Sequence, residues 1–164
     1  MPSSPLKDAR AGTDIAPELF RFVVPGKLEY RDAAKAFLSY VCNRLARRGG
    51  VPQDVAHRVV SAFVEAFNNA AIHAYRDMPP GQVDVEMEVH EYTLRVKVTD
   101  TGRSFEPAHV PEPDLDALPE GGLGLFIIRN FMDDVRYDRV ADRNVLTMEK
   151  TFEPSIGESA GDEG

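Results

Sequence analysis

Two neighbouring runs of alternating residues constrain the fold of this 164-residue chain more than any other feature. In residues 82–90, valine and methionine alternate with acids and one histidine, and in residues 92–100, leucine and valine alternate with Arg95, Lys97 and Thr99. A period of two is typical of half-buried strands, and a one-residue link predicts an antiparallel hairpin. The acids of the first run then face Arg95 and Lys97 on a solvated face.

Helical patterns on either side of this hairpin complete the expected architecture. Apolar residues recur at spacings of three and four in residues 27–48 and 53–75, which predicts two long helices with one buried stripe each. Cys42 lies on the first stripe, so we interpret it as core packing rather than a reactive thiol. The other expected elements are a strand at 19–24, a helix at 123–132, and strands at 134–140 and 145–152 joined by a turn at 142–144.

This order of elements predicts an α+β fold. We expect a two-layer α/β sandwich in which a mostly antiparallel sheet carries helices on one face. The expected organisation is a flexible N-terminus at 1–17, one domain at 18–152 and an acidic flexible tail at 153–164. No apolar run approaches membrane-helix length and no signal-peptide pattern is found, so we expect a cytoplasmic protein.

Charge and cysteine content exclude several classes of protein. The net charge of −8 argues against direct nucleic-acid binding, which needs clustered bases. Residues 103–120 hold five acids and one base, residues 153–164 hold four acids and no base, and the rest of the chain is neutral, with 18 of each. The single cysteine excludes an intramolecular disulfide and the usual zinc sites.

The first candidate site lies on the second long helix. Glu65, Asn69 and His73 are four residues apart, so they line one side of that helix. A carboxylate and an amide oxygen one turn apart are suited to Mg²⁺ shared with substrate phosphates. The alternative is an ordinary helix edge with polar rim residues, and a structural role for His73 is favoured over a catalytic one.

The second candidate site is at the end of a strand. Asp100 has the parity of the buried residues before it, so its carboxylate points toward the helices, where it needs a donor. The exocyclic amino group of a purine is one such donor, and Gly102 would let a flat ring approach the backbone. The alternative is a common strand-end Asp-x-Gly turn.

The third candidate site is a glycine cluster before a helix. Gly121, Gly122 and Gly124 run into an apolar segment, and the exposed N–H groups at such a helix start bind phosphate. The sequence is neither a Walker A motif nor a Rossmann fingerprint. The alternative is a glycine-rich turn without a ligand.

Taken in order, the three sites resemble the Bergerat ATP-binding fold of sensor histidine kinases, type II topoisomerases, MutL and heat-shock chaperones. The resemblance covers about residues 19–152. Within that superfamily the chain is most similar to bacterial anti-sigma factor serine-protein kinases. The segments that carry this similarity are Glu65-Ala66 to Tyr75, Asp100-x-Gly102-x-x-Phe105, and Gly122-Leu123-Gly124-Leu125 continuing to Val135.

The resemblance implies ATP and Mg²⁺ as cofactors and a role for each matched residue. Glu65 would be the general base, Asn69 the Mg²⁺ ligand and Asp100 the acceptor for the adenine amino group. Residues 103–121 would form a lid over the nucleotide. The remaining nucleotide-binding residues would be Gly102, Arg103, Phe105, Gly121, Gly122, Leu123, Gly124 and Leu125.

The implied reaction is ATP-dependent phosphorylation of a serine on a STAS-type anti-anti-sigma protein. The same protein would bind a sigma factor, and it would be a homodimer with no membrane or direct nucleic-acid contact. Glu120 stands where related kinases can carry a base, which leaves Arg103 as the only lid cation. Asn68 stands where threonine is frequent, and we choose Asn69 as the ligand because Asn68 is rotated by about 100° from Glu65.

Two other functions fit the same residues. One is a nucleotide-binding module that sequesters a partner with little or no kinase activity. The other is a solo ATPase that regulates another signalling protein.

Overall fold

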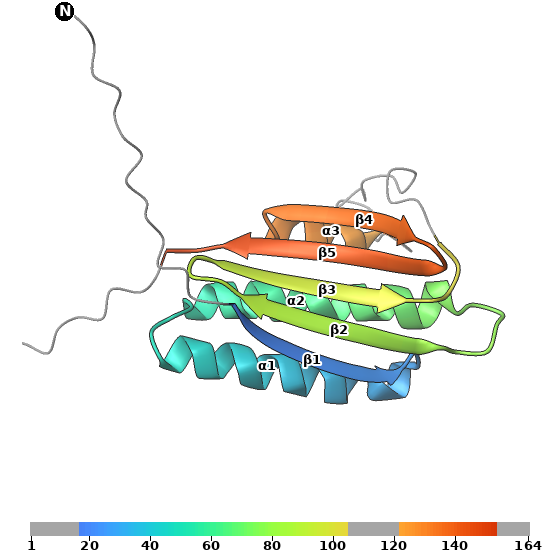
Figure 1. Cartoon of the computed structure of the whole chain (residues 1–164), viewed down its shortest axis with the longest axis horizontal. Helices are drawn as coiled ribbons and strands as arrows, with labels where there is room; N and C mark the ends of the chain where they lie inside the picture. Colours follow the sequence, from blue (N-terminus) through green and yellow to red (C-terminus); the bar gives the residue numbers. More distant parts are fainter. Residues whose placement is uncertain (1–16, 105–121, 154–164) are drawn as a thin grey trace, which may run out of the picture.

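The computed structural model describes residues 17–104 and 122–153 (Figure 1). The predicted flexible N-terminus, most of the predicted lid (residues 105–121) and the predicted tail from residue 154 lie outside these residues. None of the helices within them is long and apolar enough to cross a lipid bilayer.

A five-stranded antiparallel sheet forms one layer of the domain. Its spatial order is β1-β2-β3-β5-β4, so β5 lies between β3 and β4. The predicted hairpin pairs β2 with β3 in a register that places Glu88 opposite Arg95 and Glu86 opposite Lys97. The strands are β1 (Glu18–Pro25), β2 (Gln82–Val89), β3 (Thr93–Asp100), β4 (Asp134–Val140) and β5 (Arg143–Thr151).

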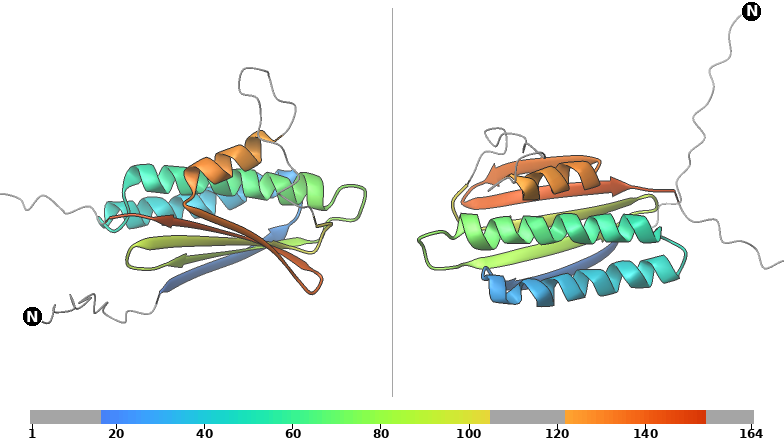
Figure 2. Two further views of the ribbon diagram at one scale, coloured as in Figure 1. Left: turned by 90° about the horizontal axis from the view of Figure 1, so that it is seen from above. Right: turned by 180° about the vertical axis from the view of Figure 1, so that it is seen from behind.

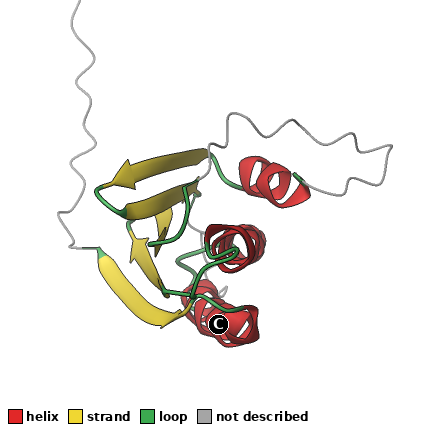
Figure 3. Cartoon of the chain, turned by 90° about the vertical axis from the view of Figure 1, so that its right-hand side faces the viewer, coloured by secondary structure: helices red, strands yellow, loops and turns green. Residues whose placement is uncertain are grey.

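All helices cover the same face of this sheet, as the end-on view in Figure 3 shows. Helix α2 runs across the middle of the sheet, with α1 on one side and α3 on the other (Figure 2). The predicted α+β class and two-layer architecture are therefore confirmed. The helical elements are η1 (Leu28–Tyr30), α1 (Arg31–Arg47), α2 (Gln53–Asn68), η2 (Asn69–Ala74) and α3 (Leu123–Phe131).

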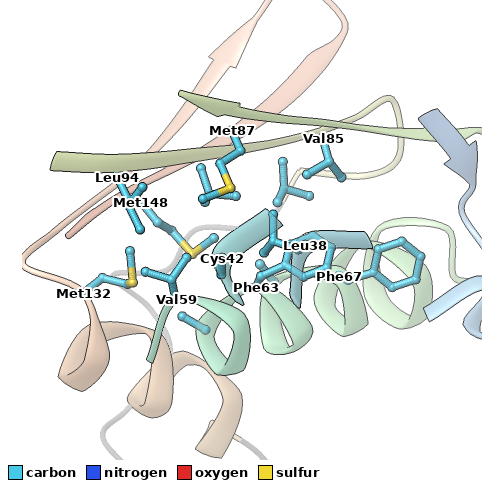
Figure 4. Packing of buried hydrophobic residues seen from close by; sticks show 14 of the residues in the cluster. Leu38, Cys42, Val59, Phe63, Phe67, Val85, Met87, Leu94, Met132 and Met148 are labelled. Atoms are coloured by element: carbon cyan, nitrogen blue, oxygen red, sulfur yellow. The ribbon is translucent and has the colours of Figure 1, made fainter. Parts of the chain in front are cut away.

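The core fills the space between the two layers (Figure 4). Phe63 and Phe67 of α2 are fully buried, and their ring centroids lie 6.1 Å apart. Cys42 belongs to this core, as predicted, and burial raises the pKa of its thiol to about 12. Burial therefore disfavours the reactive thiolate at neutral pH.

The opposite face of the sheet carries an ion-pair network. The Glu88 carboxylate accepts hydrogen bonds from Arg95 Nη1 at 2.8 Å and Lys97 Nζ at 2.9 Å. Arg95 also bonds Glu149 on β5, and Arg21 on β1 pairs with Asp84 on β2. Arg136 on β4 bonds the same Glu149 oxygen at 3.0 Å, so the polar face of the alternating strands links all five strands.

The structure corrects two predicted elements. The second long helix is α-helical only to Asn68 and continues as the π-helical turn η2, so the four-residue spacing no longer aligns His73 with Glu65, and His73 is exposed. The predicted turn at 142–144 lies one residue earlier: Ala141 and Asp142 form it, and Asn144 belongs to β5. Ala141 adopts a φ of 55°, which makes the tight turn without glycine.

Candidate functional site

Asp100 ends strand β3 and lies under the helix layer, where only 7% of it is exposed. Its Oδ1 accepts the Gly102 backbone N–H at 2.8 Å and the Asn144 Nδ2–H at 2.7 Å. Burial raises the pKa of the carboxyl, and the two hydrogen bonds and the positive charge of Arg139 only partly offset that rise. No hydrogen bond to Oδ2 is found among the described residues, so Oδ2 is open to a donor from a ligand.

Asn144, which sequence reasoning had placed in a turn, is a fully buried member of this site. It is the register partner of Asp100 across β3 and β5. Its Nδ2 also lies 3.1 Å from the Gly102 carbonyl oxygen, and its Oδ1 accepts a hydrogen bond from Arg139 Nη1 at 2.7 Å. The only sequence signal was an asparagine next to a strand, which is too common in turns to point to a site.

Gly102 lies against the end of η2 with no space for a side chain. A Cβ at Gly102 would stand 2.3 Å from the Ala74 carbonyl oxygen. That same oxygen accepts the Arg103 backbone N–H at 2.7 Å. The loop after β3 is thereby fixed to the helix layer. The close approach of the Ala74 backbone explains why position 102 is a glycine. The side chain of Arg103 is exposed.

A small cavity separates Asp100 from the helix layer. Its volume is about 20 Å³, the space of one water molecule, so a purine ring requires its walls to open. Asn69 lies on its wall, as the predicted pairing of Asn69 with Asp100 in one site requires. The full lining is Ala66, Asn69, Ala70, Ala74, Val98, Asp100, Tyr137 and Leu146.

Glu65 meets the start of α3. Gly122 precedes that helix with a φ of 81°, a left-handed conformation that favours glycine. A Cβ on Gly124 would lie 2.7 Å from Glu65 Oε2, so only glycine lets this helix start approach the carboxylate so closely. The first N–H groups of α3 have no partner within the helix and are available to an anion. Leu123 is exposed, whereas the Leu125 side chain is buried, so Leu125 can offer only its backbone.

Glu65 also lies at an open groove on the outer surface of the helix layer. The groove has a volume of about 620 Å³ and reaches from α1 across α2 to α3. Glu65 is therefore accessible to solvent on one side while it touches Gly124 on another. The groove is lined by Lys35, Ser39, Cys42, Asn43, Gln53, Ala56, His57, Val60, Ser61, Val64, Glu65, Ile127 and Phe131.

Asn68 is the one side chain with an unsatisfied buried polar atom among the described residues. Its Oδ1 is buried and has no hydrogen-bond partner there. A group of three or more His, Cys, Asp and Glu side chains suited to a metal is not found in the described parts of the chain. Phe105 and Gly121, which the sequence assigns to nucleotide binding, lie outside them.

The sheet order, the buried aspartate at the end of β3 and the glycine-led helix next to Glu65 of α2 define a histidine kinase-like ATP-binding domain. The family model described as a histidine kinase-like ATPase domain matches residues 29–150. Serine-protein kinase RsbW of Oceanobacillus iheyensis is 35% identical over 122 residues, which are 69% of this chain and 74% of that protein. RsbW of Bacillus subtilis is 35% identical over 121 residues, 69% of this chain and 73% of that protein. The chain belongs to the histidine kinase-like ATPase family and, within it, to the RsbW serine-protein kinases. The predicted family and enzyme class are confirmed.

Solved structures agree on the fold. The RsbU and RsbW domains of Rv1364c from Mycobacterium tuberculosis superpose with a TM-score of 0.59 at 16% identity over 84% of this chain. The chain spans about a third (33%) of that longer chain, and the likeness concerns the fold alone. The blue-light activated histidine kinase EL346 of Erythrobacter litoralis gives a TM-score of 0.50 at 26% identity, covering 73% of this chain and 41% of that one.

Proposed function

We propose that this protein transfers the γ-phosphoryl group of ATP to a serine of a STAS-type anti-anti-sigma protein, and that it binds a sigma factor when that antagonist is phosphorylated. The observation that carries the proposal is the position of Glu65. Its carboxylate touches the glycine-led start of α3 and also opens to a surface groove. A donor phosphate at the helix start and a serine entering from the groove would meet beside this carboxylate.

The site's residues fit an adenine nucleotide. Asp100 offers an acceptor to the adenine amino group, and the glycine at position 124 leaves the helix start beside Glu65 free of a Cβ. Mg²⁺ favours oxygen ligands and usually retains waters while it binds phosphate. Asn69, on the wall of the cavity beside Asp100, would supply an amide oxygen. When bound, the metal would neutralise charge on the phosphates.

In the proposed reaction the serine Oγ attacks the γ-phosphorus of ATP. A new Oγ–P bond forms, the bond from the γ-phosphorus to the bridging oxygen breaks, and ADP leaves with that electron pair. Glu65 accepts the hydroxyl proton, which is the role of a general base within reach of the nucleophile. The N–H groups of Leu123 and Gly124 stabilise the phosphates, and most of the rate gain comes from positioning and charge neutralisation.

A phosphotransfer assay tests this proposal. The full chain is incubated with Mg²⁺, γ-labelled ATP and a STAS-domain protein encoded in the same genome. We expect label on a serine of the partner with the wild-type chain and with Glu91→Gln, an exposed control. With Glu65→Gln we expect a loss of about a hundredfold or more. Nucleotide-dependent binding of the partner without label would contradict the kinase and support a sequestering module.

A binding measurement tests the sigma-factor part of the proposal. We expect a sigma factor of the same organism to elute with the chain in gel filtration when ATP is present. The unphosphorylated STAS protein should release the sigma factor, and the phosphorylated form should not. Unchanged elution of the sigma factor in both cases would contradict the proposed partner exchange.

A further inference from the structure

The hydrogen bonds around Asn144 admit one orientation of its amide. Arg139 can only donate, so the atom 2.7 Å from its Nη1 must be the oxygen of Asn144. An ionised carboxylate can only accept, so the atom 2.7 Å from Asp100 Oδ1 must be the nitrogen. Asn144 therefore presents N–H groups to Asp100 because Arg139 holds its other end.

This arrangement fixes which acceptor Asp100 can offer. Oδ1 already receives two hydrogen bonds, from Gly102 and Asn144, whereas Oδ2 receives none from the described residues. The Asn144 nitrogen also reaches the carbonyl oxygens of Gly102 at 3.1 Å and Arg103 at 3.2 Å, so one buried amide joins the carboxylate to the loop after β3. The carboxylate can neither rotate nor exchange its two oxygens without breaking this set of bonds.

We infer that Asn144, oriented by Arg139, is a positioning residue that makes the site select a 6-amino purine over a 6-oxo purine. The inference rests on the proposed function, in which Asp100 contacts the base. A 6-amino group donates to the free Oδ2, whereas a 6-oxo group brings an acceptor against an acceptor. A carboxyl that holds a proton would donate to the 6-oxo group and lose this discrimination. The N–H of Asn144 and the charge of Arg139 both favour the ionised form.

The geometry also explains why an asparagine is needed here. The side chain must donate one N–H to Asp100, share the other between two backbone carbonyls and accept from Arg139, which a carboxamide can do at once. An aspartate of the same shape would place a second carboxylate against Asp100 and force the pair to share a proton. Base selection then depends on a residue that need not touch the base.

The test compares ATP with ITP, which carries a 6-oxo group in place of the 6-amino group. Calorimetric titration with Mg²⁺ gives both dissociation constants for the full chain, for Asn144→Asp and for Arg139→Gln. Arg139 is exposed, so its variant is expected to fold. Asn43→Asp, on the exposed face of α1, is the matched control.

We expect the wild type and the control to prefer ATP. The ATP-to-ITP preference should fall by about tenfold in Asn144→Asp and by about threefold in Arg139→Gln, in line with the loss of hydrogen bonds to a charged group. If Asn144→Asp does not fold, the ATP-to-ITP preference of Arg139→Gln tests the inference. Folded variants with weaker ATP binding but a preference within about twofold of wild type would mean a purely structural role and would overturn the inference. A wild type that binds neither nucleotide would instead refute the proposed function.

Discussion

Asp100 is a buried carboxylate whose proton affinity is set by opposing effects. Burial raises the pKa, and the donors around Oδ1 only partly offset it. In the proposed site the ionised form accepts the adenine amino group. The pH of the solution therefore acts directly on nucleotide recognition.

We predict that ATP affinity decreases as pH falls, and at higher pH than an ordinary aspartate would cause. The affinity falls on acidification because protonation of Asp100 removes the acceptor for the adenine amino group. The raised pKa of Asp100 means that this protonation begins at a higher pH. Calorimetric titrations between about pH 5 and 8 provide the measurement. The ATP phosphates titrate in the same way in experiments with the wild type and with Asp100→Asn, but the variant has no carboxyl at position 100. The difference between the two curves of affinity against pH therefore isolates the effect of Asp100. Parallel pH curves would contradict the prediction.

Gly102 illustrates a constraint of space rather than backbone conformation. Ala74 O would lie 2.3 Å from a Cβ at position 102, and a backbone oxygen cannot move away cheaply. We predict that Gly102→Ala lowers the free energy of unfolding by about 2 kcal/mol, the usual cost of such overpacking. Urea unfolding measures this. At Gly50 a Cβ would be 3.6 Å from its nearest neighbour, so Gly50→Ala should cost much less, and equal losses would refute the explanation.

Among individual residues, the sequence pointed to Glu65, Asn69, Asp100 and the glycines because their motifs are local. Their functional roles remain predictions. It missed Asn144 and Arg139. Asparagine is depleted in strands and frequent in turns, so local preference favoured the turn. Apart from Arg139, the partners that stabilise the buried Asn144 lie 41 to 44 residues away, and no local pattern reports them.

Among the elements, α3 combines a weak helix residue with a required close contact. Alanine is a better helix former than glycine by about 1 kcal/mol, which favours replacing Gly124. The new Cβ, however, would lie 2.7 Å from Glu65 Oε2, and this flexible carboxylate would move aside.

We therefore predict that Gly124→Ala separates stability from activity. Its free energy of unfolding should be unchanged or slightly higher, while phosphotransfer falls by about tenfold because the carboxylate is displaced. Chemical denaturation and the labelling assay measure the two quantities. Leu123→Ala, at an exposed position of the same helix start, is the control. Full activity of Gly124→Ala would show that the position of Glu65 is not limiting.

Within the described residues, the sequence patterns predicted all five strands and the three α-helices, but neither the separate 3-10 turn η1 nor the change from α2 to η2. The apolar spacing of three and four continues past Asn68, so the sequence reads as one helix. Tertiary contacts decide otherwise: the Ala74 carbonyl accepts from Arg103, and the small buried Ala70 and Ala74 allow close packing. A π-helical segment of this kind is often found at functional sites.

For the molecule as a whole, the two layers differ in how they use charge. The outer sheet face is held by ion pairs that extend across all five strands, from β1 to β4. Glu88 has three basic neighbours, and the hydrogen bond from Lys97 is the largest cause that lowers its pKa to about 2, with burial opposing it. Because its pKa is lower in the native state, the carboxylate stabilises the fold above its ordinary range near pH 4.5, and that contribution disappears as pH falls toward about 2.

We predict that Glu88→Gln lowers the free energy of unfolding by about 1–2 kcal/mol at neutral pH, an amount reduced by solvent screening of this face. At about pH 2 the variant and the wild type should approach the same stability. Urea unfolding at both pH values provides the measurement. Glu91→Gln, in the exposed turn, should change little at either pH. A difference that persists unchanged in acid would contradict the ionic origin.

The fold class followed from the hydrophobic period of each segment, which is two residues in the strands and 3.6 residues in the helices. The strand order did not, because the position of β5 between β3 and β4 depends on long-range pairing that alternation does not encode. The sequence also showed a neutral domain with acidic segments at residues 103–120 and 153–164. These two segments lie largely outside the described residues.

The register pair of Asp100 and Asn144 has a consequence for folding. It joins residues 44 positions apart in β3 and β5, and contacts of such sequence separation slow folding. Without the β4–β5 hairpin, Asp100 lacks its hydrogen bond from Asn144 and the proposed base site is incomplete. A nucleotide that binds only the completed sheet shifts the folding equilibrium by mass action. Under the proposed function, the ATP concentration would then help to determine how much of this chain is folded.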